Sequence, residues 1–100
     1  MITKSRITSV FRDLRKIGYF AKQNFWCCQS CAWHDIPRDV EKVVFYHKQD
    51  GAAIKNGILV ATLYLAWSGD GTQICNVLSS HGLNYEWNGD SDKRIKILAN

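Results

Sequence analysis

The spacing of the apolar residues changes along the chain, and this change limits the folds that the chain can adopt. Between residues 7 and 17, apolar side chains recur at steps of three and four, so they share one face of a helix. Between residues 83 and 87, and again between 94 and 98, apolar and polar residues alternate as on a half-buried strand. Both kinds of element must bury an apolar side, which predicts an α+β domain.

Three helices are predicted, and two of them lie in the first third of the chain. The first covers residues 7–17, and Gly18 supplies a C-terminal stop because glycine readily adopts the left-handed conformation found there. The second covers residues 24–36, where Asn24 can cap the start and Pro37 disfavours helix at the residue before it. The buried face of this second helix would hold Phe25, Cys28, Ala32 and Ile36.

The third helix is predicted to follow Asp70, because an aspartate can accept the free backbone N–H groups at the start of a helix. Gln73 stands three residues later, so the two residues form a variant of the capping box. Gly82 closes this helix. The apolar stripe between these two ends consists of Ile74, Val77 and Leu78.

Four strands are predicted from runs of β-branched and aromatic residues and from alternation. They cover residues 43–47, 58–67, 83–87 and 94–98, and the second of them is apolar on both faces. The elements therefore follow one another in the order α-α-β-β-α-β-β. The simplest packing is a mostly antiparallel four-stranded sheet with the helices against one face, in a single α+β domain that spans residues 1–100.

The composition is that of a globular domain. The chain has 100 residues, 46% of them hydrophobic, which suits one domain with its own core. No stretch of about 18 apolar residues occurs, so no membrane-spanning helix is expected. The basic N-terminus is not followed by the apolar segment of a secretory signal. We therefore expect a cytoplasmic protein whose 4 cysteines are reduced.

The positive charge is concentrated at the N-terminal end. The formal net charge is +4, but residues 1–22 carry six basic residues against Asp13, a local charge of +5. Arg12, Arg15 and Lys16 would lie on the outward face of the first helix, where they could contact a nucleic-acid backbone. A solvated helix face gives the same pattern, and we favour that interpretation over nucleic-acid binding.

Cysteine and histidine cluster in the second predicted helix. Cys28 and Cys31 have the spacing of a zinc knuckle, with Cys27 beside them, and His34 could be a third ligand. A structural zinc site needs four ligands, which would have to come from distant residues: His47, Cys75 or His81. Ligands at steps of three on a helix also diverge by about 60° per step. We favour packing of these small side chains between helix and sheet, with zinc as an alternative.

A second cluster of polar side chains ends the strand that begins at residue 43. Tyr46, His47, Gln49 and Asp50 could line the mouth of a ligand or partner site, where His47 could hydrogen-bond or transfer a proton. The simpler interpretation is that His47 and Gln49 satisfy backbone groups as the strand ends. A nucleophilic cysteine near a histidine is a further alternative, but no spacing requires it. No catalytic triad, nucleotide-binding glycine pattern or paired-carboxylate pattern is present.

Four blocks of sequence follow one another in a fixed order: Cys27-Cys28-Gln29-Ser30-Cys31-Ala32, Phe45-Tyr46-His47-Lys48-Gln49-Asp50, Leu63-Tyr64-Leu65-Ala66-Trp67 and Gly82-Leu83-Asn84-Tyr85-Glu86-Trp87-Asn88-Gly89. With these blocks the chain resembles an uncharacterised bacterial domain family among the numbered domains of unknown function. The resemblance covers roughly residues 5–98 and implies a bacterial or phage source. The family has no activity to transfer, so it assigns no site residue.

The sequence favours a small, non-enzymatic interaction module, because no complete set of catalytic residues is present. Its partner is expected to be another protein rather than a nucleic acid or a membrane, and no cofactor is expected. An inhibitor of a host system, encoded by a phage or a mobile element, would fit the size of the chain. Three alternatives stay open: a zinc-stabilised domain, a nucleic-acid-binding protein that uses its first helix, and a cysteine–histidine enzyme.

Overall fold

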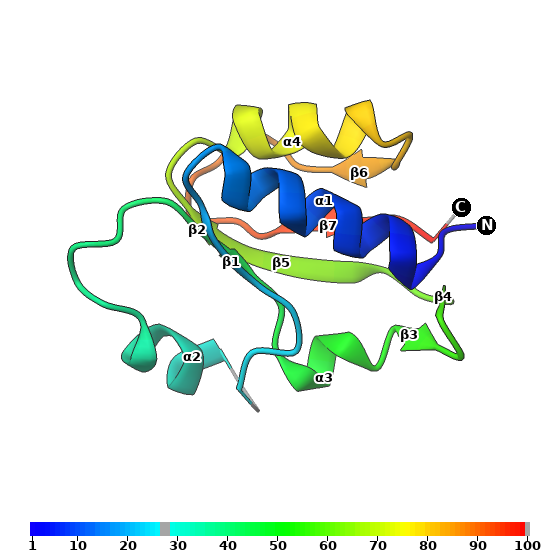
Figure 1. Cartoon of the computed structure of the whole chain (residues 1–100), viewed down its shortest axis with the longest axis horizontal. Coiled ribbons are helices and arrows are strands. Elements are labelled where there is room, and N and C mark those ends of the chain that lie inside the picture. The colour runs from blue at the N-terminus through cyan, green and yellow to red at the C-terminus, as the bar shows by residue number, and fades with distance from the viewer. Residues whose placement is uncertain (27–28, 100) are drawn as a thin grey trace.

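The chain folds into a five-stranded mixed sheet and a separate two-stranded hairpin, with helices on both faces of the larger sheet (Figure 1). The computed structural model describes residues 1–26 and 29–99. The helices are α1 (Lys4–Lys16), α2 (Gln29–Asp35), α3 (Lys48–Gly51) and α4 (Gly71–Ser80). The strands are β1 (Phe20–Lys22), β2 (Val43–Phe45), β3 (Ile54–Lys55), β4 (Ile58–Leu59), β5 (Leu63–Ser68), β6 (Tyr85–Glu86) and β7 (Ile95–Ile97).

The larger sheet has the strand order β1-β2-β5-β7-β6, with β5 at its centre. β1 and β2 pair in parallel, whereas the other neighbours are antiparallel. The predicted α+β class is confirmed, but the prediction of four strands is wrong because it missed β1. This strand has only three residues, too few to display a period of two.

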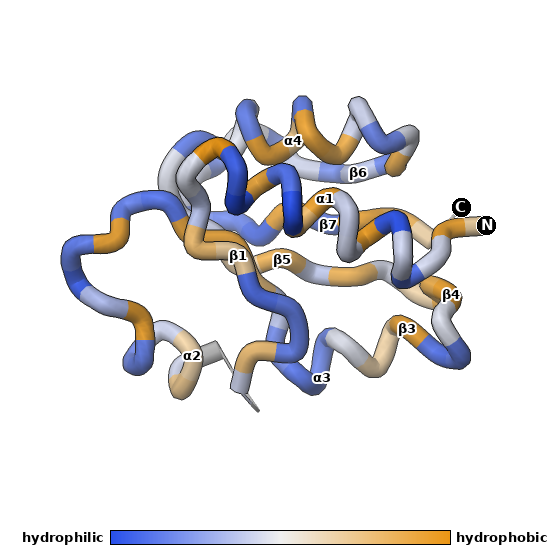
Figure 2. Tube along the Cα trace, viewed as in Figure 1, coloured by the Kyte–Doolittle hydropathy of each residue, from blue (hydrophilic) through white to orange (hydrophobic). Residues whose placement is uncertain are grey.

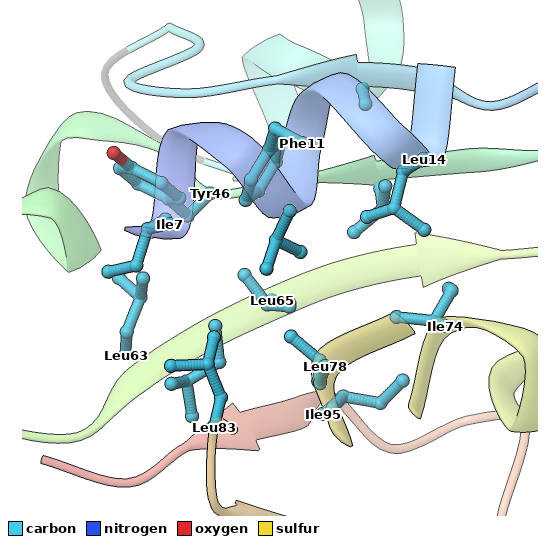
Figure 3. Close-up of a cluster of buried hydrophobic side chains, with 14 of the residues drawn as sticks. Ile7, Phe11, Leu14, Tyr46, Leu63, Leu65, Ile74, Leu78, Leu83 and Ile95 are labelled. Atoms are coloured by element: carbon cyan, nitrogen blue, oxygen red, sulfur yellow. The ribbon is translucent and has the colours of Figure 1, made fainter. Parts of the chain in front are cut away.

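The main core lies between the sheet and the pair of helices α1 and α4. Ile7, Phe11 and Leu14 of α1 are fully buried, as are Ile74 and Leu78 of α4. They join side chains from the inner face of β5 and β7, namely Leu63, Leu65, Ile95 and Ile97. Figure 3 shows the labelled side chains of α1, α4, β5 and β7 converging, and Figure 2 shows hydrophobic and hydrophilic residues alternating around both helices.

The opposite face of the sheet carries a second, smaller core beneath α2. Ala32 of α2 packs there with Val43 and Phe45 of β2 and with Ala66 of β5. Since neighbouring strand residues point to opposite faces, this cluster lies across the sheet from Val44 and Leu65 in the main core. The prediction that all helices pack against one face is therefore wrong.

α4 begins and ends as the sequence predicts, and α1 ends as predicted but begins earlier, at Lys4 after the N-cap Thr3 rather than at residue 7. α1 has Ile17 as its C-cap, and Gly18 follows with φ of +99°. The Asp70 side chain accepts the N–H of Gln73 at the start of α4, 3.2 Å away. The reciprocal bond of a capping box is replaced by the buried Tyr19, whose hydroxyl accepts from the Asp70 N–H and donates to the Asp70 carbonyl. This hydroxyl ties the end of α1 to the start of α4.

The second predicted helix is shorter than expected. α2 begins at Gln29, because Asn24 and Trp26 have left-handed backbone angles and Asn24 caps no helix. The N–H of Phe25 instead donates to the Tyr46 carbonyl beside the end of β2. Phe25 still packs in the smaller core with Ala32 and Ile36, as expected. The remaining member of the predicted buried face, Cys28, lies outside the described residues.

The predicted strands are confirmed in place but not in length. The segment predicted as one strand over 58–67 divides into β4, which forms a hairpin with β3, and the central strand β5. The predicted strand over 83–87 shortens to β6. The short helix α3 was not predicted, since its four residues are all polar or glycine. No helix in the described part of the chain is long and apolar enough to cross a membrane.

An ion pair connects α1 to the end of α4 on the outside of the main core. His81, the C-cap of α4, donates from Nε2 to Asp13 Oδ2 across 2.7 Å. This hydrogen bond is the main cause that lowers the pKa of Asp13, and the charges of His81, Arg12 and Lys16 act in the same direction. Ionised Asp13 is therefore favoured in the folded protein.

We expect this ion pair to contribute stability that is lost in acid. A carboxyl whose pKa is lowered on folding stabilises the protein above the pKa of the unfolded chain, near 3.8, and less as the pH falls further. Asp13→Asn should therefore reduce the free energy of unfolding, measured in urea, more at about pH 5 than at about pH 2.5.

Asp39→Asn is the matched control, since Asp39 is exposed and belongs to no ion pair among the described residues. A stability loss in Asp13→Asn that is the same at both pH values would contradict the role of the ionised carboxylate.

Candidate functional site

One part of the larger sheet is left uncovered by the helices, on the same side as α2. Tyr64 of β5 lies directly opposite Lys96 of β7, which in turn lies opposite Glu86 of β6. These three residues alternate with apolar residues of the main core, so they point away from α1 and α4. The result is a row of polar and aromatic side chains across three adjacent strands.

A groove runs along this row, and we call it the sheet-face groove. It encloses about 470 Å³ and combines two aromatic rings with charges of both signs. Its lining consists of Tyr64, Glu86, Trp87, Asn88, Asp92, Lys93, Arg94 and Lys96. The site is therefore assembled from β5, β6, β7 and the turn that joins the last two.

Two tryptophans fix this turn against the rest of the protein. Trp67 and Trp87 meet edge to face, with their ring centroids 5.3 Å apart. The indole N–H of Trp67 donates to the Lys93 carbonyl, and that of Trp87 donates to the Asp90 carbonyl. The first residue of α4, Gly71, lies so close that an added Cβ would approach the Trp87 ring to 2.5 Å. The wall of the sheet-face groove is thus held by ring packing and two indole hydrogen bonds rather than left as a free loop.

Arg94 is held in place at the base of the groove. Its guanidinium carbon lies 4.8 Å from the centre of the Tyr64 ring, and Lys96 Nζ lies 5.6 Å from the same ring. Arg94 also donates from Nη1 to Asp50 Oδ2 across 2.7 Å. The Asp50 carboxylate is only 16% exposed, which makes this ion pair better shielded from solvent than the pair of Lys96 with Glu86.

His47 supports the same carboxylate. Its Nδ1 accepts the N–H of Asp50 and so caps α3, while Nε2 lies 3.2 Å from Asp50 Oδ2. Since Nδ1 is an acceptor, Nε2 is the nitrogen that carries the proton, and it faces the Asp50 carboxylate. His47 is 6% exposed and has both ring nitrogens engaged. This geometry suits a residue that positions Asp50, which agrees with the simpler sequence interpretation of His47.

The other residues predicted beside His47 do not gather at the groove. Tyr46 points to the opposite face of the sheet, where it packs edge to face on Phe11 and donates to Gln23 Oε1. Burial raises the pKa of Tyr46 to about 12. Gln49 is exposed on α3. Of the four predicted residues in this cluster, the structure therefore brings His47 and Asp50 together.

The predicted basic residues of the first helix lie on the other side of the molecule. Arg12 and Lys16 are exposed, and each lies within 4.0 Å of the Asp13 carboxylate. Arg15 instead donates from Nη1 to the Ala21 carbonyl of β1, across 2.9 Å. Because β1 is an edge strand, Arg15 occupies a carbonyl that an added strand would otherwise use. Arg15 thus has a structural contact, whereas Arg12 and Lys16 face solvent.

The predicted metal ligands are only partly brought together. Cys31 and His34 are exposed on α2 and line a hollow of about 420 Å³ with Trp26, Ser30 and Asp35. The distant candidates His47, Cys75 and His81 contact Asp50, the main core and Asp13 respectively. Cys27 and Cys28 lie outside the described residues. Within residues 1–26 and 29–99, no three His, Cys, Asp or Glu side chains come together as ligands for one metal ion.

The buried thiol of α4 is a poor nucleophile. Cys75 lies in the main core at 3% exposure, and burial raises its pKa. A nucleophilic cysteine requires the opposite change, because the thiolate is the reactive form. His47 lies on the other face of the sheet from Cys75 and faces Asp50. These two residues therefore do not form a cysteine–histidine pair.

The groove residues were missed at the sequence level, although one signal pointed to them. The alternation over 94–98 placed Arg94 and Lys96 on the polar side of a strand, and the alternation over 83–87 did the same for Glu86. Tyr64 gave no such signal, because its strand is apolar on both faces. Only the register of β5, β7 and β6 shows that these side chains form one row.

Asp50→Asn tests whether this carboxylate holds Arg94 and His47 together. The substitution keeps the shape of the side chain but removes a charged acceptor that two donors share. We expect a loss of about 1.5–3 kcal/mol in the free energy of unfolding, measured in urea at neutral pH. Glu86→Gln, which breaks the more exposed pair with Lys96, should cost less than about 1 kcal/mol. Equal losses in the two variants would contradict a special role for Asp50.

Comparison with known proteins adds a family but no activity. The search of curated proteins and the search of solved structures give no match. The model of the family described as a domain of unknown function, DUF6891, matches residues 2–100. This match confirms the expected membership in a family of uncharacterised domains. The chain therefore belongs to the DUF6891 family.

Proposed function

We propose that the protein is a non-enzymatic interaction module of the bacterial cytoplasm, which binds another protein through the sheet-face groove. The observation that carries this proposal is the composition of the groove, which Tyr64, Trp87 and Arg94 line together beside the uncovered part of the sheet. Tyrosine, tryptophan and arginine are the residues that most often dominate the binding energy of protein interfaces.

The rigidity of the groove supports the same proposal. Arg94 is held by Asp50 and Tyr64, and the neighbouring turn is held by the two tryptophan N–H groups. Side chains that are already ordered lose less conformational entropy when a partner binds. A fixed groove with an aromatic base and charged walls is therefore well suited to receive a segment of another protein.

The chemistry of the described residues favours binding over catalysis. Both ring nitrogens of His47 are engaged by Asp50, and the pKa of the Cys75 thiol is raised. General base and nucleophilic roles both require an available lone pair close to the substrate. A cysteine–histidine enzyme would instead have to use Cys31 and His34, which line the hollow on α2.

The nucleic-acid and zinc hypotheses stay as alternatives. Arg12 and Lys16 could contact phosphates, although Asp13 lies between them and reduces the local positive charge. Zinc would have to use Cys31 and His34 together with residues outside the described part of the chain. The hollow beside Cys31 and His34 has one aromatic ring, that of Trp26, whereas the sheet-face groove has two aromatic rings and an arginine.

Site-specific photo-crosslinking tests the proposal. A photoreactive phenylalanine derivative replaces Asp92, an exposed residue that lines the groove and leaves its cations in place. In the lysate of cells that encode the protein, we expect one adduct of defined mass that is sensitive to protease and resistant to nuclease. The additional substitution Tyr64→Ala should reduce its yield about tenfold or more, as for a residue central to an interface.

The same photoreactive residue in place of Arg12 is the control, because Arg12 lies on the opposite side of the sheet. Equal protein adducts at both positions, or no adduct at the groove, would contradict the proposal. A nuclease-sensitive adduct confined to the Arg12 position would favour the nucleic-acid alternative instead.

A further inference from the structure

We infer that the sheet-face groove recognises a glutamate or aspartate side chain of its protein partner through the Arg94 guanidinium. This inference rests on the proposed function and adds the chemical group that is recognised. It depends on three features of the groove, which are the orientation of Arg94, the position of two lysines and the presence of carboxylates on the same walls.

The orientation of Arg94 favours a planar anion. The guanidinium has five N–H donors in a fixed plane, and Asp50 engages Nη1. The Tyr64 ring holds the guanidinium from one side, and the Arg94 side chain remains 35% exposed. In the described part of the chain, Asp50 is the acceptor that Arg94 contacts. Donors on the remaining edges of the guanidinium can pair with both oxygens of an incoming carboxylate.

Lys93 and Lys96 add positive charge to the same groove that Arg94 lines. All three cations line the groove, and Lys96 Nζ lies over the same Tyr64 ring as Arg94. A carboxylate that enters the groove would therefore meet cations around a shared aromatic base. The charge on these walls complements an acidic side chain.

The carboxylates of the groove indicate a protein rather than a polyanion. Glu86 and Asp92 line the groove beside the three cations. A nucleic-acid backbone carries a phosphate at every nucleotide, so successive phosphates would meet these carboxylates at close range. An acidic side chain flanked by neutral or basic residues avoids this repulsion. The mixed charge therefore favours a peptide segment with separated carboxylates.

Nuclear magnetic resonance on the whole ¹⁵N-labelled chain tests this inference. The probe is a capped hexapeptide of alanine with one central glutamate, and its matched control replaces this glutamate by glutamine. We expect the glutamate peptide to shift the Arg94 side-chain Nε–H signal and the backbone N–H signal of Lys96. The glutamine peptide should bind about tenfold more weakly, because it cannot form charge-assisted hydrogen bonds.

Two matched arginine variants show on which side of the sheet the glutamate peptide binds. Arg94→Gln should abolish the shift at Lys96, whereas Arg12→Gln, the same change on the opposite side of the sheet, should leave it intact. If Arg94→Gln does not fold, Lys93→Gln replaces it, since Lys93 is exposed and lines the groove. That variant should weaken binding about two- to fivefold.

Four outcomes would overturn the inference. These are no shift at Arg94 with the glutamate peptide, equal binding of the two peptides, equal weakening by Arg12→Gln, and tighter binding of a thymidine hexanucleotide at the same signals. If the photo-crosslinking experiment gives a protein adduct at position 92 and any of these outcomes is also found, the proposed function stands. Only the inference that Arg94 recognises a carboxylate of the partner is then rejected. Loss of that adduct would reject the proposed function itself.

Discussion

The packing of α1 and α4 on one face of the central strands is the interaction on which the rest of the structure depends. Leu63 and Leu65 of β5, with Ile95 and Ile97 of β7, are fully buried beneath these helices. Because strand residues alternate, this burial sends Tyr64 and Lys96 to the other face. The helix α2 covers part of that face over β2 and Ala66. The remaining part, over β5, β7 and β6, carries the sheet-face groove.

Long-range polar contacts convert this uncovered area into an ordered site. Asp50, which follows β2, reaches Arg94, which precedes β7, so the ion pair crosses the position of β5 in the sheet. His47 caps the short helix that carries Asp50, and Trp67 fixes the backbone at Lys93. The His47 cap is local, but the Asp50–Arg94 and Trp67–Lys93 contacts join residues that are distant in the chain. The site therefore forms only when the whole sheet has folded.

The elements that the sequence predicted best are those whose signal is local. The stripe from Ile7 to Leu14, the cap at Asp70 and the stop at Gly18 each act within one or two helical turns, and all three are confirmed. The sheet was harder because β1 and β6 have only three and two residues. His47 and Asp50 were identified as polar residues after a strand, but Arg94 could not be joined to them without the strand register.

Hydroxyl-radical footprinting of the protein alone and with its bound partner tests the central claim most directly. Tyr64 and Trp87 are half-buried aromatic residues in the groove, whereas Tyr85 is 38% exposed and pairs with Ile97 on the other face of the sheet. We expect partner binding in the groove to slow the oxidation of Tyr64 and Trp87 and to leave the oxidation of Tyr85 unchanged. Slower oxidation of Tyr85, with Tyr64 and Trp87 unchanged, would contradict this expectation.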